Sequence, residues 1–153
     1  MSSKKHLMLI GVVLLILAFS QISKTTSSVP TPVPPDDLSF VSATRVDTTT
    51  SMTFVNVPGA LTFTTTQHRT FLVEFFTSAR VTVPGEHIEL RATVDGVPVS
   101  PTMKYTGTEL SSVAYSGFLV GVAPGFHTVR MQWRVTGGSA IMENRNFIAW
   151  VVP

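Results

Sequence analysis

The sequence predicts an all-β domain, an antiparallel β-sandwich or jelly roll, preceded by one hydrophobic N-terminal helix. Three observations support this fold class. Residues 6–22 form the one long uninterrupted apolar run of the chain. From residue 38 onward, apolar and polar residues alternate with a period of two, which is typical of half-buried strands. Prolines and glycines recur at short intervals in the same region and leave no room for a long helix, so several short strands in two packed sheets are expected.

The apolar run follows Lys4 and Lys5, and this positive flank favours a cytoplasmic N-terminus. One interpretation is a retained signal anchor of a single-pass cell-membrane protein, because 17 residues reach the lower limit of the ~17 to 25 that span a bilayer. The alternative is a signal peptide cleaved near Ser20, which would release a secreted domain. Both interpretations place the rest of the chain on the periplasmic or extracellular side. The residues expected to form the membrane anchor are Leu7, Leu9, Ile10, Val12, Val13, Leu14, Leu15, Ile16, Leu17 and Phe19.

A linker rich in proline, serine and threonine follows the run. Its four prolines, at positions 30, 32, 34 and 35, favour a polyproline II spacer of about 3 Å per residue. A disordered tail left after signal cleavage is the alternative. The chain therefore divides into a signal anchor or signal peptide at 1–22, a linker at 23–37 and an extracytoplasmic β-sandwich domain at 38–153.

Alternation and turn residues locate the strands. In residues 86–94, Ile88 and Leu90 are expected on the buried face, while His87 and Glu89 are expected on a solvated one. Asp95 and Gly96, which follow directly, are a strong signal for a two-residue hairpin turn. Strands are expected at 38–46, 52–57, 60–65, 70–77, 86–94, 102–105, 113–122, 127–135 and 146–152.

Two of these strands are apolar on both faces. In FLVEFF, at 71–76, the second face carries Leu72 and Phe76 beside Glu74, and in FIAWVV, at 147–152, both faces are entirely apolar. A strand of a two-layer sandwich that is apolar on both faces needs a further covering layer, which could be another subunit, a partner or the chain's own loops. The residues predicted to form a partner interface are Phe76, Phe147, Ile148, Trp150 and Val152.

Composition argues against several functions. From residue 36 onward, eight Lys and Arg residues face all nine Asp and Glu residues, so the domain carries a net charge of −1 and offers no electrostatic footprint for nucleic acid. The chain has no cysteine and therefore no disulfide or thiolate chemistry. No serine lies in a nucleophile turn, and the histidines of the domain are scattered. His87 and Glu89 are interpreted as a polar face rather than a metal fragment, and His127 as a hydrogen-bonded histidine at the rim of the core. No cofactor, metal site or catalytic residue is expected.

The C-terminal region resembles a known group of folds. GFHTVRMQWRV, at 125–135, together with SGFLVGV, at 116–122, and the apolar last strand, is similar to the closing strands of jelly-roll domains of the tumour-necrosis-factor and C1q type, including their bacterial and phage relatives. The resemblance covers about forty residues. It implies a non-enzymatic recognition or structural module, often a homotrimer packed through aromatic and aliphatic strand faces.

Two functional hypotheses follow. The first is a non-enzymatic, membrane-anchored extracytoplasmic β-sandwich protein that acts as an accessory or structural subunit and docks on a larger membrane or envelope assembly. The second is a secreted, trimeric binding module of the C1q or tumour-necrosis-factor type that recognises glycan or protein. The expected partners are the membrane, through the N-terminal helix, and other protein subunits or further copies of the chain.

Overall fold

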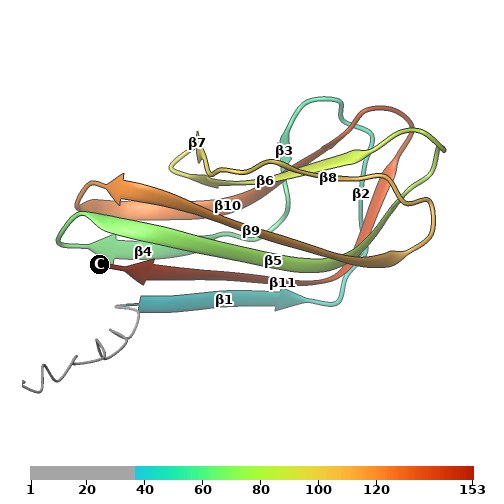
Figure 1. Ribbon diagram of the computed structural model, residues 1–153. Helices are drawn as coiled ribbons and strands as arrows, with labels where there is room; N and C mark the ends of the chain where they lie inside the picture. The colour runs from blue at the N-terminus through green and yellow to red at the C-terminus, as the bar shows by residue number, and fades with distance from the viewer. Residues whose placement is uncertain (1–36) are drawn as a thin grey trace, which may run out of the picture. The chain divides into compact units, whose positions relative to one another are not determined.

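The computed structural model describes residues 37–153, and these residues form two antiparallel β-sheets packed face to face (Figure 1). The predicted anchor and most of the predicted linker lie outside the described residues. Within the described part of the chain, no helix is long and apolar enough to cross a membrane. The strands of this region are β1 (Asp37–Ala43), β2 (Asp47–Thr49), β3 (Val55–Asn56), β4 (Leu61–Thr65), β5 (Arg69–Val81), β6 (Ile88–Val94), β7 (Val97–Pro98), β8 (Met103–Tyr105), β9 (Ser111–Val122), β10 (Gly125–Val135) and β11 (Ala140–Val152).

The chain crosses repeatedly between the two sheets. The first, which we call sheet A, has the order β1-β11-β5-β9, with β2 pairing beside β1 on β11. The second, sheet B, has the order β3-β10-β6-β7, with β4 also on β10 and β8 also on β6. The first and last strands are therefore neighbours, and the middle strands are distributed over both sheets. This interleaving is the double Greek key of a jelly roll, which confirms the predicted fold class of the domain.

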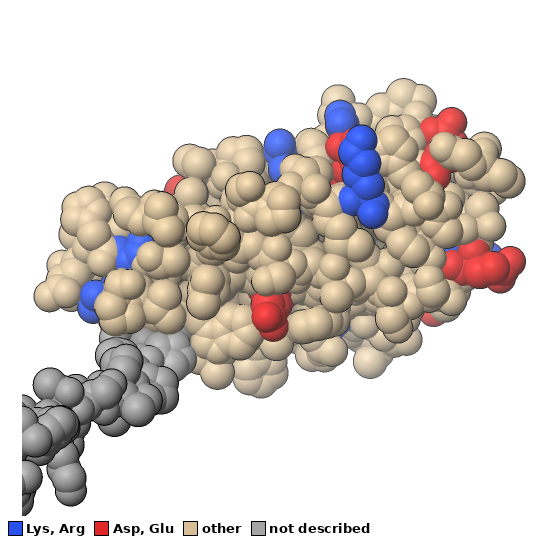
Figure 2. Space-filling model, in the orientation of Figure 1, with Lys and Arg blue, Asp and Glu red and all other residues tan. Residues whose placement is uncertain are grey.

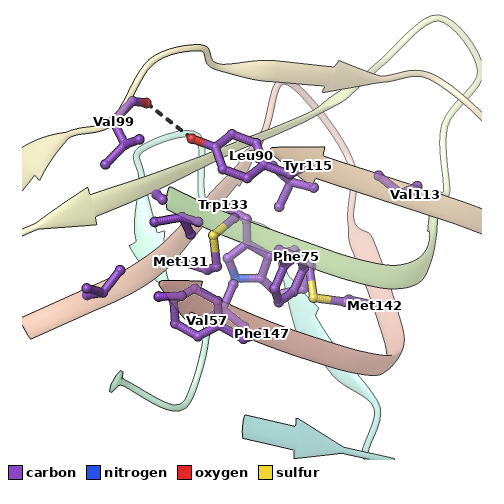
Figure 3. Packing of buried hydrophobic residues seen from close by; sticks show 14 of the residues in the cluster. Val57, Phe75, Leu90, Val99, Val113, Tyr115, Met131, Trp133, Met142 and Phe147 are labelled. Atoms are coloured by element: carbon purple, nitrogen blue, oxygen red, sulfur yellow. Dashed lines mark hydrogen bonds between the residues drawn. The ribbon is translucent and has the colours of Figure 1, made fainter. Parts of the chain in front are cut away.

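The core lies between the sheets and is built by the predicted alternation. Trp133 and Met131 of β10 face Phe75 of β5 and Phe147 of β11, and each of these side chains is at most 2% exposed (Figure 3). The rings of Phe75 and Phe147 form an edge-to-face pair with centroids 6.1 Å apart. At the rim, the Tyr115 hydroxyl donates to the carbonyl of Val99 at 3.2 Å, so the polar end of this buried ring has a partner.

The predicted hairpin after β6 is confirmed. Asp95 and Gly96 both have positive φ angles, 52° and 84°, as a two-residue turn between antiparallel strands requires. Val94 and Val97 are paired on either side of the turn. The strand after this turn, β7, is only two residues long.

Other strand boundaries differ from the prediction. β11 begins at Ala140 rather than at residue 146, since its register shifts between Glu143 and Asn146 and moves the buried side chains from even to odd positions. The predicted strand at 38–46 ends at Ala43. The predicted strand at 52–57 shrinks to the two residues of β3, because the segment before it loops over sheet B.

A buried ion pair lies where the register of β11 shifts. Arg145 of β11 is 4% exposed and pairs with Asp47 of β2, which also accepts hydrogen bonds from Arg45 at 2.8 and 2.5 Å. A buried charge is tolerated only where an opposite charge compensates it. The pair therefore ties β2 to the last strand, which lies almost a hundred residues later in the sequence.

Candidate interaction face

The outer face of sheet A, the side turned away from the core, carries many partly or fully exposed apolar side chains. It receives side chains from all four long strands of the sheet, β1, β5, β9 and β11. Its most exposed members are Phe40, at 72%, Val120, at 64%, and Phe118, at 56%. We call this surface the apolar face. Its residues are Leu38, Phe40, Leu72, Phe76, Phe118, Val120, Ile148, Trp150 and Val152.

The strand register places these side chains in contiguous rows across the sheet. One row runs from Leu38 through Trp150 and Leu72 to Phe118, each paired directly with the next. In the adjacent row, Phe40 is paired with Ile148. Directly opposed residues of an antiparallel pair have Cβ atoms about 4.5–5.5 Å apart, so the side chains of a row touch. The apolar face is therefore one patch and not a scatter of single residues.

The apolar face is almost free of charge. Glu74, paired with Ile148 on one side and Ser116 on the other, is the acidic residue among its central rows. Trp150, Val152, Leu72 and Glu74 line a shallow, largely apolar groove that is open to solvent. Figure 2 shows how few Lys, Arg, Asp and Glu side chains interrupt the surface on the side that it draws. Exposed apolar patches of this kind mark interaction sites in soluble domains.

The structure brings together four of the five predicted interface residues. Phe76 is 41% exposed, and Ile148, Trp150 and Val152 are partly exposed on the same side of β11. Phe147 is different, because it points into the core and is 2% exposed. Its inclusion in a surface interface was wrong, since successive residues of a strand point to opposite faces and Phe147 has the parity of the core.

Sequence reasoning missed the contributions of the two edge strands to this face. Leu38 and Phe40 flank Ser39 in β1, and Phe118 and Val120 flank Leu119 in β9. Local sequence does not show which side of these two strands faces the core. Only the pairing of both strands with β5 and β11 shows that these side chains point outward.

The outer face of sheet B has the opposite character. Glu89 of β6 lies at its centre and is bonded by His87 at 3.1 Å, by Arg134 at 2.7 Å and by Lys104 at 3.4 Å. The ring of Phe54, from the loop before β3, lies over Arg91 and Arg134, with guanidinium carbons 3.8 and 4.8 Å from its centroid. Cation–π contacts of this kind hold the loop over the strand.

The prediction that this side of β6 is solvated was wrong for Glu89 and Thr93, which are 6% and 2% exposed. For Glu89 the physical reason is that the side chains of His87, Lys104 and Arg134 surround its carboxylate and bond to it. Burial on its own raises the pKa of Glu89, but hydrogen bonds from Arg134, His87 and Lys104 outweigh it, so the pKa lies below its ordinary value. No group of three or more potential metal ligands occurs among residues 37–153.

A second polar cluster lies at the end of the sandwich near the β6–β7 turn. His127 is 5% exposed; its Nδ1 lies 2.8 Å from Asp95 Oδ2 and its Nε2 lies 3.2 Å from the Thr65 hydroxyl. The predicted hydrogen-bonded histidine at the rim of the core is thereby confirmed, although its partners come from β4 and from the hairpin turn. Asp95 also accepts from the Thr128 N–H at 2.7 Å.

The hydroxyl, imidazole and carboxylate of this cluster contact one another in the order of a catalytic triad. The hydroxyl and the imidazole, however, do not line an open groove. Thr65 and His127 are both buried, and the polar groove next to Asp95 is lined by the turn and by outward residues of β10, not by the hydroxyl or the imidazole. Burial raises the pKa of Asp95, and the hydrogen bonds from His127 and Thr128 lower it by more. The cluster joins β4, β10 and the hairpin at the end of the sandwich.

Comparison with known proteins shows the fold and nothing finer. No family model matches the sequence, and no curated protein matches it either. Among solved structures, the chain is similar to the VP2 subviral particle of infectious bursal disease virus, with a TM-score of 0.55 and 6% identity over 77% of this chain and 33% of that one. The chain thus spans about a third of the VP2 chain.

Two further solved structures are similar to this chain with lower TM-scores. The sugar-binding C-terminal domain of EclA matches with a TM-score of 0.44 and 12% identity, over 69% of this chain and 78% of that one. The CBM36-1 domain of a xylanase from the hindgut metagenome of Trinervitermes trinervoides matches with a TM-score of 0.39 and 11% identity, over 73% and 96%. The likeness to VP2 agrees with the strand order in showing the fold of the domain, a jelly roll or β-sandwich. The narrower resemblance to the tumour-necrosis-factor and C1q type is not specifically shown.

Proposed function

We propose that this chain is a non-enzymatic, membrane-anchored extracytoplasmic protein whose jelly-roll domain docks on a larger membrane or envelope assembly as an accessory or structural subunit. The observation that carries the proposal is the apolar face. Its rows of apolar side chains cover the outer side of sheet A, whereas the outer side of sheet B is closed by a polar network and a loop of its own. A face of this composition, open to solvent within the described residues, suits a protein partner.

Anchoring is the second part of the proposal, and the sequence supports it. The apolar run at 6–22 follows Lys4 and Lys5, so it would hold the N-terminus in the cytoplasm and the domain on the periplasmic or extracellular side. The proline-containing linker would then separate the domain from the bilayer. The intact mass of the protein from washed membranes tests this part. A mass that matches a chain starting near Gln21, instead of the full-length chain, would show that the apolar run is a cleaved signal peptide and not an anchor.

Docking is tested by one variant on each sheet. Trp150→Asp places a charge in the middle of the apolar face, and Phe126→Asp places one at an aromatic residue of sheet B that is 68% exposed. We expect Trp150→Asp to abolish co-purification of the native partners from membranes and Phe126→Asp to leave it intact. Circular dichroism and thermal melting show whether both variants fold. Unchanged partners with a folded Trp150→Asp protein would remove the docking role of this face.

A further inference from the structure

The exposed edge of β1 is a strand edge with no device against pairing. Within residues 37–153, β1 pairs with β11 alone, so alternate N–H and C=O groups along its other side point away from sheet A. Its sequence, DLSFVSA, has a charge only at its first position and contains neither lysine nor proline. Natural proteins protect exposed edges with such residues, with very short strands or with covering loops.

The remaining sheet edges of the described region are protected more fully. On β9, the Phe118 N–H donates to the Ser100 carbonyl at 3.2 Å, and a Cβ on Gly117 would lie 2.7 Å from the same oxygen, so a loop covers this edge at its centre. Sheet B ends in strands of two to five residues. Two of these, β7 and β8, carry Pro98 and Lys104. The edge of β1 is thus the long unprotected one, and it borders the apolar face.

We infer that this edge pairs with β1 of a second copy of the chain, antiparallel, around a two-fold axis perpendicular to sheet A. The register that overlaps all seven residues is centred on Phe40 and sets it opposite Phe40 of the second copy. Asp37 then lies opposite Ala43, so no charged residue of β1 meets another. Cross-strand aromatic pairs stabilise antiparallel strands, and Phe40, at 72% exposure, has room for such a pair.

The two-fold axis also explains why edge and face belong together. Because the axis is perpendicular to the sheet, the apolar faces of both copies lie on the same side. The pairing joins four long strands from each copy and widens the apolar surface from about 19 Å to about 38 Å, at about 4.8 Å per strand. Two seven-residue strands bury less than the roughly 1,200 Å² of a standard stable interface, so the dimer is expected to be reversible and concentration-dependent. This inference goes beyond the proposed function, since it concerns the edge of the sheet and not the partner of its face.

Matched substitutions on the full chain in detergent test the pairing. Phe40→Lys puts a cation on the β1 edge, and Phe118→Lys puts one on the same face at β9. Analytical ultracentrifugation over a concentration series should show a monomer–dimer equilibrium for the native chain and for Phe118→Lys, and at least tenfold weaker association for Phe40→Lys. A native chain that stays monomeric at every concentration, or equal losses in both variants, would overturn the inference; equal losses would indicate packing through the face.

Cysteine cross-linking tests the register independently of stability. The chain has no cysteine, so each introduced thiol is the only one. Under mild oxidation, Phe40→Cys should form a disulfide-linked dimer, and Leu38→Cys should cross-link to Ser42→Cys when the two chains are mixed. Ser116→Cys, equally outward on β9, is the control and should remain monomeric. Cross-linking through position 116 and not through position 40 contradicts edge pairing even if Phe40→Lys fails to fold. None of these outcomes depends on the result for Trp150→Asp, so the two proposals fail separately.

Discussion

The outer faces of the two sheets differ in the kind of side chain that the strand alternation places on them. Both sheets send alternate side chains into one shared core. On sheet B, the other side carries a polar network around the buried Glu89, and the ring of Phe54 lies against Arg91 and Arg134. On sheet A, the other side exposes rows of apolar side chains around a single central acid, Glu74. Single exposed apolar residues are ordinary, but contiguous rows are not, so under the proposed function the first face serves stability and the second serves interaction.

The sharpest test of this difference uses two neighbouring residues of β5. Phe75→Ala removes a core ring that is 1% exposed, and we expect a loss of about 3–5 kcal/mol in the free energy of unfolding. Phe76→Ala removes a ring of the apolar face that is 41% exposed, and here we expect less than about 1 kcal/mol. Urea denaturation measures both. Similar losses for the two variants would mean that the apolar face is part of the stabilising core.

A second pair of variants compares the two central acids. Glu89→Gln weakens the charged hydrogen bonds of sheet B and should lower the free energy of unfolding by about 2 kcal/mol at pH 7. Glu74→Gln on the apolar face should change it by less than about 0.5 kcal/mol.

The pH dependence follows from the lowered pKa of Glu89 in the folded protein. The carboxylate stabilises the fold above its ordinary pKa of 4.5, and this contribution is lost as the pH falls through the lower, folded-state pKa. The difference in free energy of unfolding between the native protein and Glu89→Gln should therefore disappear at acidic pH. A difference in free energy of unfolding that stays constant with pH would show that the substitution acts through packing and not through charge.

The smallest expected effect concerns the surface itself. Phe118→Ser and Phe126→Ser each remove one exposed aromatic ring, on sheet A and on sheet B, and should change stability by about 0.5 kcal/mol or less. Binding of a fluorescent apolar dye should fall clearly for Phe118→Ser, because that ring belongs to a contiguous patch, and little for Phe126→Ser. Equal dye binding by both variants would show that the apolar face binds apolar molecules no better than the outer face of sheet B.

Much of the domain could be predicted from local sequence. The period-two alternation identified the jelly-roll or sandwich class, the buried Ile88 and Leu90, and the strands 86–94 and 127–135. The Asp95–Gly96 dipeptide located its turn, because few residues other than glycine and aspartate or asparagine adopt two successive positive φ angles. The doubly apolar last strand pointed to a surface that needs a cover, and Ile148 and Trp150 are part of it.

Other features could not be predicted because they depend on partners far away in the chain. The phase change near Arg145 hid half of β11, and the residue that compensates this buried charge is Asp47. The Glu89 carboxylate pairs with Arg134 of β10, which lies 45 residues later in the sequence.

The sequence by itself determined that the domain is a β-sandwich, which residues alternate, and that an apolar segment and a proline-containing segment precede it. For strands with apolar residues on both sides, only the tertiary structure decided which side faces the core, because alternation then defines two sides without saying which is inside. That choice depends on pairing between distant strands. It places Phe147 in the core and Phe40, Phe118 and Trp150 together on one outer face.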